Sequence, residues 1–223
     1  MIEINYILIP IISFLLGSIP FAFLYGKLIL KKDLREFGSK NTGALNVLRL
    51  ASKKGKLFGL ISFLIAFLLD AFKAAFAVYL ANQMIPDNFV LATTLASFFA
   101  VLGHNYSIVL NFKGGRGAAS LGGIILYLNW QVFIIAIAII ICFMVLFEII
   151  FGGTVNKRFL KHSISEQIIG RVIGEAFFVF WIYLQYPILF YPMLFPMVLV
   201  IFAHWDRIEG QIKNMKNKTY FHD

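Results

Sequence analysis

The sequence predicts an all-α integral membrane protein whose residues 1–223 form a single polytopic domain. Hydrophobic residues make up 60% of the 223-residue chain and charged residues only 14%, and the mean hydropathy is +0.83. A soluble domain would have about 25% charged residues. Apolar runs near the roughly 20 residues that cross a bilayer recur along the chain, and most of the Lys and Arg residues gather between these runs.

Seven apolar runs predict about seven transmembrane helices. We expect a kink in the first helix at Gly17 and Pro20. The third run is interrupted late by the polar segment 103–105, and the fourth is too short for a full span, so we interpret it as a half-helix. The runs cover residues 6–30, 57–81, 89–112, 117–128, 130–151, 172–186 and 188–203.

The basic clusters predict the orientation of the chain. They follow the first, third, fifth and seventh runs, so with seven crossings all of them lie on one face. Because positive charge marks the cytoplasmic side, we expect the N-terminus outside and the C-terminus in the cytoplasm, in a multi-pass protein of the cell membrane. The cytoplasmic parts would be residues 31–56, 113–117, 152–171 and the tail 204–223. The net charge of +9 then reflects topology, and we expect no nucleic-acid partner.

A glycine-rich stretch at residues 103–120 is the first candidate for a functional site. Its core is Lys-Gly-Gly-Arg-Gly, from Lys113 to Gly117, and the residues after it are apolar enough to begin a helix. Glycines let the backbone turn its N–H groups toward a ligand, and a helix N-terminus carries partial positive charge. The stretch therefore predicts an anion site for phosphate at the membrane surface. The alternative is a tight turn whose basic residues only mark the cytoplasmic side.

A second donor-rich loop, residues 38–49, follows the first run. It combines glycines with neutral donors such as Ser39 and Asn41 and with the charges of Lys40 and Arg49. Arginine can hold a phosphate through two parallel hydrogen bonds. Two such loops on one face indicate two phosphate groups, or one that is held from both sides. The alternative is an ordinary solvated loop.

Two charged residues lie inside the second run. Asp70 and Lys73 are three residues apart, so they share one helical face, and we expect them to form a structural ion pair within the bundle. His104 and His204 both fall at cytoplasmic ends of runs, beside the phosphate-type loops. The single cysteine, Cys142, and the absence of any metal-type Cys/His spacing predict no metal site.

Five motifs follow one another in the order, and roughly the spacing, of a known family. They are Ser18-Ile19-Pro20, the stretch from Gly38 to Arg49, Asp70 with Lys73, Gly103-His104, and the stretch from Phe112 to Gly117. On these motifs nearly the whole chain resembles the bacterial membrane acyl-phosphate:glycerol-3-phosphate acyltransferases, the PlsY family.

The resemblance implies a cytoplasm-facing enzyme of phospholipid synthesis. It would move a fatty acyl group from acyl phosphate to the 1-hydroxyl of sn-glycerol 3-phosphate, giving lysophosphatidic acid and phosphate without a cofactor. Other lipid-synthesis enzymes are possible partners within the lipid membrane. The residues expected to be catalytic are Ser39, Arg49, Lys113 and His204. Those expected to bind substrate are Asn41, Gly43, Asn46, His104, Gly114, Gly115, Arg116 and Gly117.

The chain departs from the family pattern most clearly at the third motif. In His204-Trp205-Asp206-Arg207, Arg207 stands where the family usually has Asn. This departure keeps open a catalytically silent or acceptor-altered paralogue. A transporter of organic phosphates is a further alternative, because half-helices aimed at anions suit such proteins, although no inverted repeat is visible.

Overall fold

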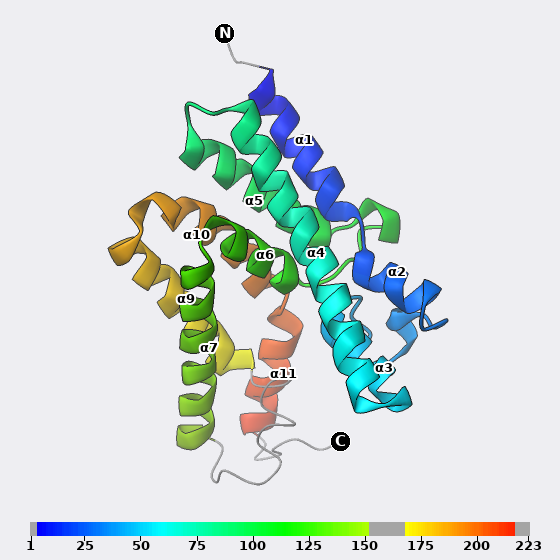
Figure 1. Ribbon diagram of the computed structural model, residues 1–223. Coiled ribbons are helices and arrows are strands. Elements are labelled where there is room, and N and C mark those ends of the chain that lie inside the picture. Colours follow the sequence, from blue (N-terminus) through cyan, green and yellow to red (C-terminus); the bar gives the residue numbers. More distant parts are fainter. Residues whose placement is uncertain (1–3, 152–167, 217–223) are drawn as a thin grey trace.

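The computed structural model describes residues 4–151 and 168–216, and every regular element in them is a helix (Figure 1). The predicted cytoplasmic segment 152–171 and the tail 204–223 therefore lie partly outside the described residues. The α-helices are α1 (Asn5–Ser18), α2 (Phe21–Leu28), α3 (Ala44–Ala51), α4 (Lys56–Met84), α5 (Phe89–Asn105), α6 (Ala118–Leu128), α7 (Trp130–Phe151), α9 (Ile168–Gln185), α10 (Phe190–Phe202) and α11 (Trp205–Lys216). Four single-turn 3-10 helices join them: Leu34–Glu36, Ser52–Lys54, Ile108–Leu110 and Pro187–Leu189.

The described residues confirm a membrane protein built of apolar helices. Five segments are long and apolar enough to cross a bilayer: Asn5–Leu28, Lys56–Met84, Phe89–Leu110, Trp130–Phe151 and Ile168–Gln185. A sixth is formed if Pro187–Phe202 and Trp205–Lys213, which meet at 54°, count as one broken span. Helix α6 is shorter, as the half-helix interpretation expects. The described residues thus contain five or six candidate spans, against about seven expected.

The expected kink in the first span is a break between α1 and α2. Proline lacks an N–H group and keeps the preceding residue extended, and Ile19 before Pro20 is indeed extended. The break frees two backbone carbonyls inside the membrane, where each needs a partner. Lys73 of α4 donates to the carbonyl of Ile19, and the Ser107 hydroxyl donates to that of Ser18. Lys73, which the sequence places inside the second run, therefore satisfies a backbone carbonyl that the break in the first span leaves without a helical partner.

The long segment between α2 and α4, which the basic clusters predict to be cytoplasmic, contains more regular structure than a loop. It includes the amphipathic helix α3 between two 3-10 turns, because Ala44, Val47 and Ala51 of this helix can pack in a buried hydrophobic cluster. Helix α9 begins at Ile168, so Arg171, predicted in the preceding loop, lies instead in the first turn of a membrane helix. The first turn of α11 begins directly after His204.

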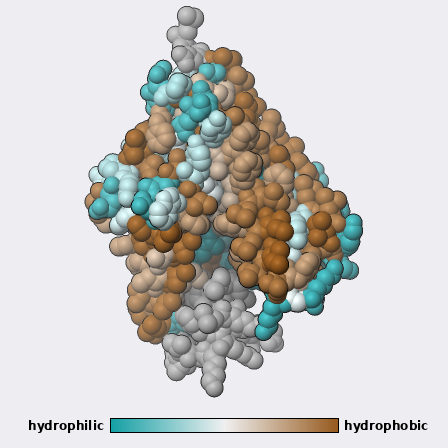
Figure 2. Space-filling model, in the orientation of Figure 1, coloured by the Kyte–Doolittle hydropathy of each residue, from teal (hydrophilic) through white to brown (hydrophobic). Residues whose placement is uncertain are grey.

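Small residues let the helices approach closely. A side chain at Gly17 of α1 would collide with the backbone of Ala100 in α5, and one at Gly123 of α6 would collide with the backbone of Ala71 in α4. Helices α1, α4 and α5 pack together in one half of the molecule, α7 packs on α9 in the other, and α6 touches both halves (Figure 1). Figure 2 shows hydrophobic residues over most of one face, with a hydrophilic patch recessed between the two halves.

Candidate active site

The donor-rich loop that comes first in the chain, residues 38–43, which we call the first loop, is positioned by hydrogen bonds with Asn46. The Asn46 side chain is buried, and its Nδ2 donates to the carbonyls of Leu34, Phe37 and Asn41 at 2.8, 2.8 and 2.9 Å. Its Oδ1 accepts from the backbone N–H of Ser39 at 3.3 Å. Gly38 has a φ of 56°, and a Cβ there would lie 2.5 Å from that same Oδ1. The buried Asn46 side chain therefore fixes the backbone conformation of this loop.

We expect Asn46→Asp to lower the free energy of unfolding by about 1–3 kcal/mol, because a carboxylate oxygen would face three carbonyl oxygens that lose their donor. Thermal unfolding in detergent micelles measures this change. Asn129→Asp is the matched control, because among the described residues the Asn129 side chain makes hydrogen bonds only through Oδ1, which accepts from the N–H groups of Gln131 and Val132. Equal stabilities of the two variants would contradict the role given to Asn46.

The second loop, residues 112–117, returns to the end of α5 before α6 begins. The N–H groups of Gly114 and Gly115 donate to the carbonyls of Asn105 and His104, both at 3.0 Å. These two amides therefore satisfy carbonyls at the end of α5 and are not available to a ligand. A Cβ at Gly115 would collide with Nε2 of His104. Gly117, at a φ of 81°, turns the chain into α6, so the predicted entry into a helix at residue 118 is confirmed.

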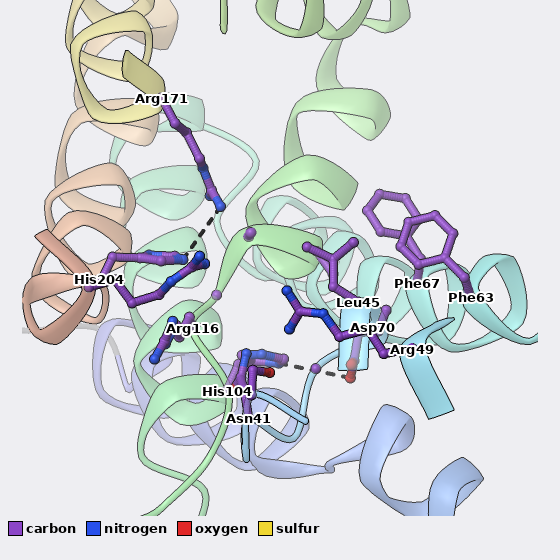
Figure 3. A pocket seen from close by; sticks show the side chains of 17 residues that line it. Asn41, Leu45, Arg49, Phe63, Phe67, Asp70, His104, Arg116, Arg171 and His204 are labelled. Carbon is purple, nitrogen blue, oxygen red and sulfur yellow. Dashed lines mark hydrogen bonds and ion pairs between the residues drawn. The ribbon is translucent and has the colours of Figure 1, made fainter. Parts of the chain in front are cut away.

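The two loops meet at a cavity of about 190 Å³ that we call the arginine cavity. Four arginines from four elements line it: Arg49 from α3, Arg116 from the second loop, Arg171 from α9 and Arg207 from α11. Figure 3 shows the guanidinium of Arg49 pointing into this space and Arg171 reaching toward His204. The N-terminal residues of α6 complete the wall. Converging cations and a helix N-terminus make this a site for an anion.

Acidic partners fix two of these arginines. Arg116 Nη2 lies 2.7 Å from Oδ2 of Asp206, and Arg171 Nε lies 2.8 Å from Oε1 of Glu175. Burial lowers the pKa of Arg116, Asp206 opposes this shift, and the positive charges of Arg171 and Arg49 add to it. A bound phosphate would reduce the electrostatic repulsion among these arginines.

The two histidines differ in their surroundings. His204 places Nδ1 at 2.7 Å from the carbonyl of Val200, so Nδ1 carries the hydrogen, and Nε2 can accept from Arg171 Nη1 at 3.4 Å. His104 is buried, and its Nδ1 lies 3.8 Å from Oδ1 of Asp70, beyond hydrogen-bonding distance. Asp70 itself pairs with Lys73 at 2.8 Å, so the predicted ion pair forms.

Two further cavities adjoin the arginine cavity. The lysine cavity, about 480 Å³, is lined by Lys113, Gly114, Gly115, Arg35 and Lys40, and it shares Ser39, Asn41 and Arg116 with the arginine cavity. The apolar cavity, about 220 Å³, lies between α4, α6, α7 and α9. It shares Phe67, Ala118 and Arg171 with the arginine cavity. The arginine cavity thus adjoins both the basic lysine cavity and the apolar cavity.

The residues predicted for the site divide among these spaces. Lys113, Gly114 and Gly115 line the lysine cavity, and Asn46 lines neither polar cavity. The remainder line the arginine cavity: Ser39, Asn41, Gly43, Arg49, His104, Arg116, Gly117 and His204. Among residues 4–151 and 168–216, no group of three His, Cys, Asp or Glu side chains could hold a metal ion.

Sequence reasoning did not assign a site role to Arg171, Arg207 or Asp70, which also line the arginine cavity. A signal for Arg171 was present, because Arg171 and Glu175 are four residues apart beside an apolar run. Charged residues within membrane helices usually face the bundle interior.

Comparison with known proteins identifies the family to which this chain belongs. The family model described as glycerol-3-phosphate acyltransferase matches residues 7–214. The chain belongs to the glycerol-3-phosphate acyltransferase family. A member from Pelagibacter ubique is 32% identical over 214 residues, covering 96% of this chain and 95% of its own. A member from Ehrlichia ruminantium (strain Gardel) is 30% identical over 212 residues, covering 95% of each chain.

The fold of this family member matches a solved structure. The crystal structure of PlsY, an integral membrane glycerol 3-phosphate acyltransferase in its glycerol 3-phosphate form, superposes with a TM-score of 0.69. The match covers 98% of this chain and 95% of the other at 22% identity. The acyltransferase fold expected from the motifs is therefore confirmed.

Proposed function

We propose that this protein is a membrane acyltransferase that moves a fatty acyl group from acyl phosphate to the 1-hydroxyl of sn-glycerol 3-phosphate. The observation that carries the proposal is the arginine cavity, where four arginines converge beside an apolar cavity. This combination suits a substrate with an anionic head and a hydrocarbon tail. Family membership supports the acyl transfer to glycerol 3-phosphate.

The three cavities suggest a place for each substrate. The head of acyl phosphate would bind in the arginine cavity through Arg49 and Arg116, and its tail would enter the apolar cavity past Phe67. Glycerol 3-phosphate would bind in the lysine cavity through Lys113. Ser39 and Asn41 line both polar cavities, so they lie where the two substrates would meet.

The arrangement suits transfer without a covalent enzyme intermediate. Acyl phosphate is already activated, so the glycerol oxygen can replace the phosphate oxygen on the acyl carbon directly. In net terms the C–O bond to phosphate breaks, and the released phosphate gains the hydroxyl proton. The protein then has to position two anions and stabilise the developing charge, which requires donors such as Arg49 and Lys113.

The topology proposed for this enzyme places the site in the cytoplasm. The first and second loops both carry basic residues, which favours the cytoplasmic side of the cell membrane. With about seven crossings, counting α6, the N-terminus would be outside and the C-terminus inside. Acyl phosphate would then enter from the lipid and glycerol 3-phosphate from the cytosol.

Phosphate release by the purified protein in phospholipid vesicles tests this function. With a long-chain acyl phosphate, we expect release that requires glycerol 3-phosphate and is accompanied by lysophosphatidic acid. Lys113→Ala should remove most of this activity, because the phosphate of the acceptor loses a cation. Lys54→Ala, an exposed lysine that lies over the Phe58 ring, is the matched control and should retain it.

Folded wild-type protein that releases no more phosphate than Lys113→Ala would contradict the proposal. Binding of acyl phosphate without turnover would then favour the silent paralogue, for which the altered third motif at Arg207 is the supporting observation. Turnover with another polyol phosphate in place of glycerol 3-phosphate would favour an altered acceptor.

A further inference from the structure

An ion pair inside a membrane helix connects the polar and apolar cavities. Arg171 lies in the first turn of α9, and Glu175 lies one turn deeper on the same face. The Glu175 side chain is 3% exposed, whereas that of Arg171 is 18% exposed. Both residues line the apolar cavity, but of the two only Arg171 also lines the arginine cavity.

The donors of Arg171 are only partly used. Nε donates to Oε1 of Glu175 at 2.8 Å, and Nη1 lies 3.4 Å from Nε2 of His204. Within residues 4–151 and 168–216, Nη2 has no hydrogen-bond partner, and neither does the buried Oε2 of Glu175. Guanidinium groups hold phosphate and carboxylate oxygens through paired donors. Arg171 can therefore bind a ligand while Glu175 holds it in position.

A purely structural role accounts poorly for this pair. Removing two charges from water is unfavourable, and a buried ion pair often stabilises a fold no better than apolar residues of the same size. The pair is also incompletely satisfied, since one carboxylate oxygen has no partner among the described residues. Arg171 lies at the boundary that the arginine cavity and the apolar cavity share, where an anionic head and an apolar tail would meet, and this position suggests a ligand.

We propose that Arg171 binds the acyl-phosphate head of the donor where the head meets the hydrocarbon tail, and that Glu175 is the residue that positions Arg171. This inference rests on the proposed function and adds a donor-binding residue to it. The first polar atoms that follow an acyl tail are the carbonyl and bridging oxygens, and Arg171 lies at the boundary where these would be located. Figure 3 shows its side chain entering the cavity from α9, opposite Arg49.

The decisive variant replaces both members of the pair. In Arg171→Met/Glu175→Leu no unpaired charge is left in the membrane, so we expect the protein to fold. Initial rates of lysophosphatidic acid formation are measured against palmitoyl phosphate and, separately, against glycerol 3-phosphate. We expect the KM for palmitoyl phosphate to rise about 10- to 100-fold, the range for a charge-assisted hydrogen bond, with little change in the KM for glycerol 3-phosphate.

Two further variants make the result specific. Arg171→Lys keeps the charge but not the paired donors, so the KM for palmitoyl phosphate should rise less than in the double variant. Lys54→Ala should match the wild type. A folded double variant with the wild-type KM for palmitoyl phosphate would overturn the proposal. The ion pair between Arg171 and Glu175 would then have a structural role only. If the double variant does not fold, an unchanged KM in Arg171→Lys overturns it in the same way.

The wild-type rate separates this inference from the proposed function. If folded wild-type protein makes no lysophosphatidic acid, the proposed function fails. Equilibrium binding of palmitoyl phosphate then still tests Arg171, because weaker binding to the double variant than to the wild type supports its role and equal binding overturns it.

Discussion

Replacing Arg49 with alanine is expected to reduce kcat/KM for acyl transfer by about 100- to 1,000-fold, the usual loss when a donor to developing charge is removed. Arg49 lies in the last turn of α3 and points into the arginine cavity (Figure 3). Within residues 4–151 and 168–216 it makes no ion pair, so its donors are free for a ligand. Its loss leaves a phosphate oxygen without compensation.

Rates measured on vesicle-reconstituted protein test this prediction, with thermal unfolding as a check on folding. Arg49→Lys should lose less than Arg49→Ala, because it keeps the charge but cannot donate two parallel hydrogen bonds. Lys53→Ala, a neighbouring cation that lies 4.3 Å from the centre of the Phe37 ring, should have a near-normal rate. A folded Arg49→Ala with wild-type kcat/KM would remove Arg49 from the site.

Asp70→Ala is expected to lower the free energy of unfolding by about 3–5 kcal/mol, because breaking a buried pair leaves its partner uncompensated. Asp70 and Lys73 are 1% and 3% exposed, and their charged atoms are 2.8 Å apart. Lys73 also donates to the carbonyl of Ile19 at the α1–α2 break. An unpaired Lys73 would therefore weaken the packing of α4 against the first span as well.

Thermal unfolding in detergent micelles measures this loss, and activity is compared per amount of folded protein. Asp70→Asn should be milder, since an amide oxygen can still accept from Lys73 without carrying charge. Asp70 also lines the arginine cavity and lies 3.8 Å from His104. A stable but inactive Asp70→Ala would therefore show that the carboxylate takes part in the reaction and is not only structural.

The sequence alone determined the class of this protein and the positions of its two loops. Long apolar runs must be helical in a bilayer because no water is present to satisfy the backbone, so α4, α5 and α7 could be predicted from composition. The donors of residues 38–49 and 113–117 were visible for the same local reason, because polar and glycine-rich segments cannot lie against lipid. The pairing of Asp70 with Lys73 followed from helical spacing.

Only the tertiary structure decided which residues share a cavity. Arg171 and Arg207 reach the site because α9 and α11 pack beside the loop before α6, a contact between segments far apart in the sequence. The folded backbone also directs the N–H groups of Gly114 and Gly115 to the carbonyls at the end of α5, and the Asn46 side chain to the carbonyls of the first loop. Local composition determines which groups are available, whereas long-range packing determines where they point, and a residue's chemistry at the site depends on both.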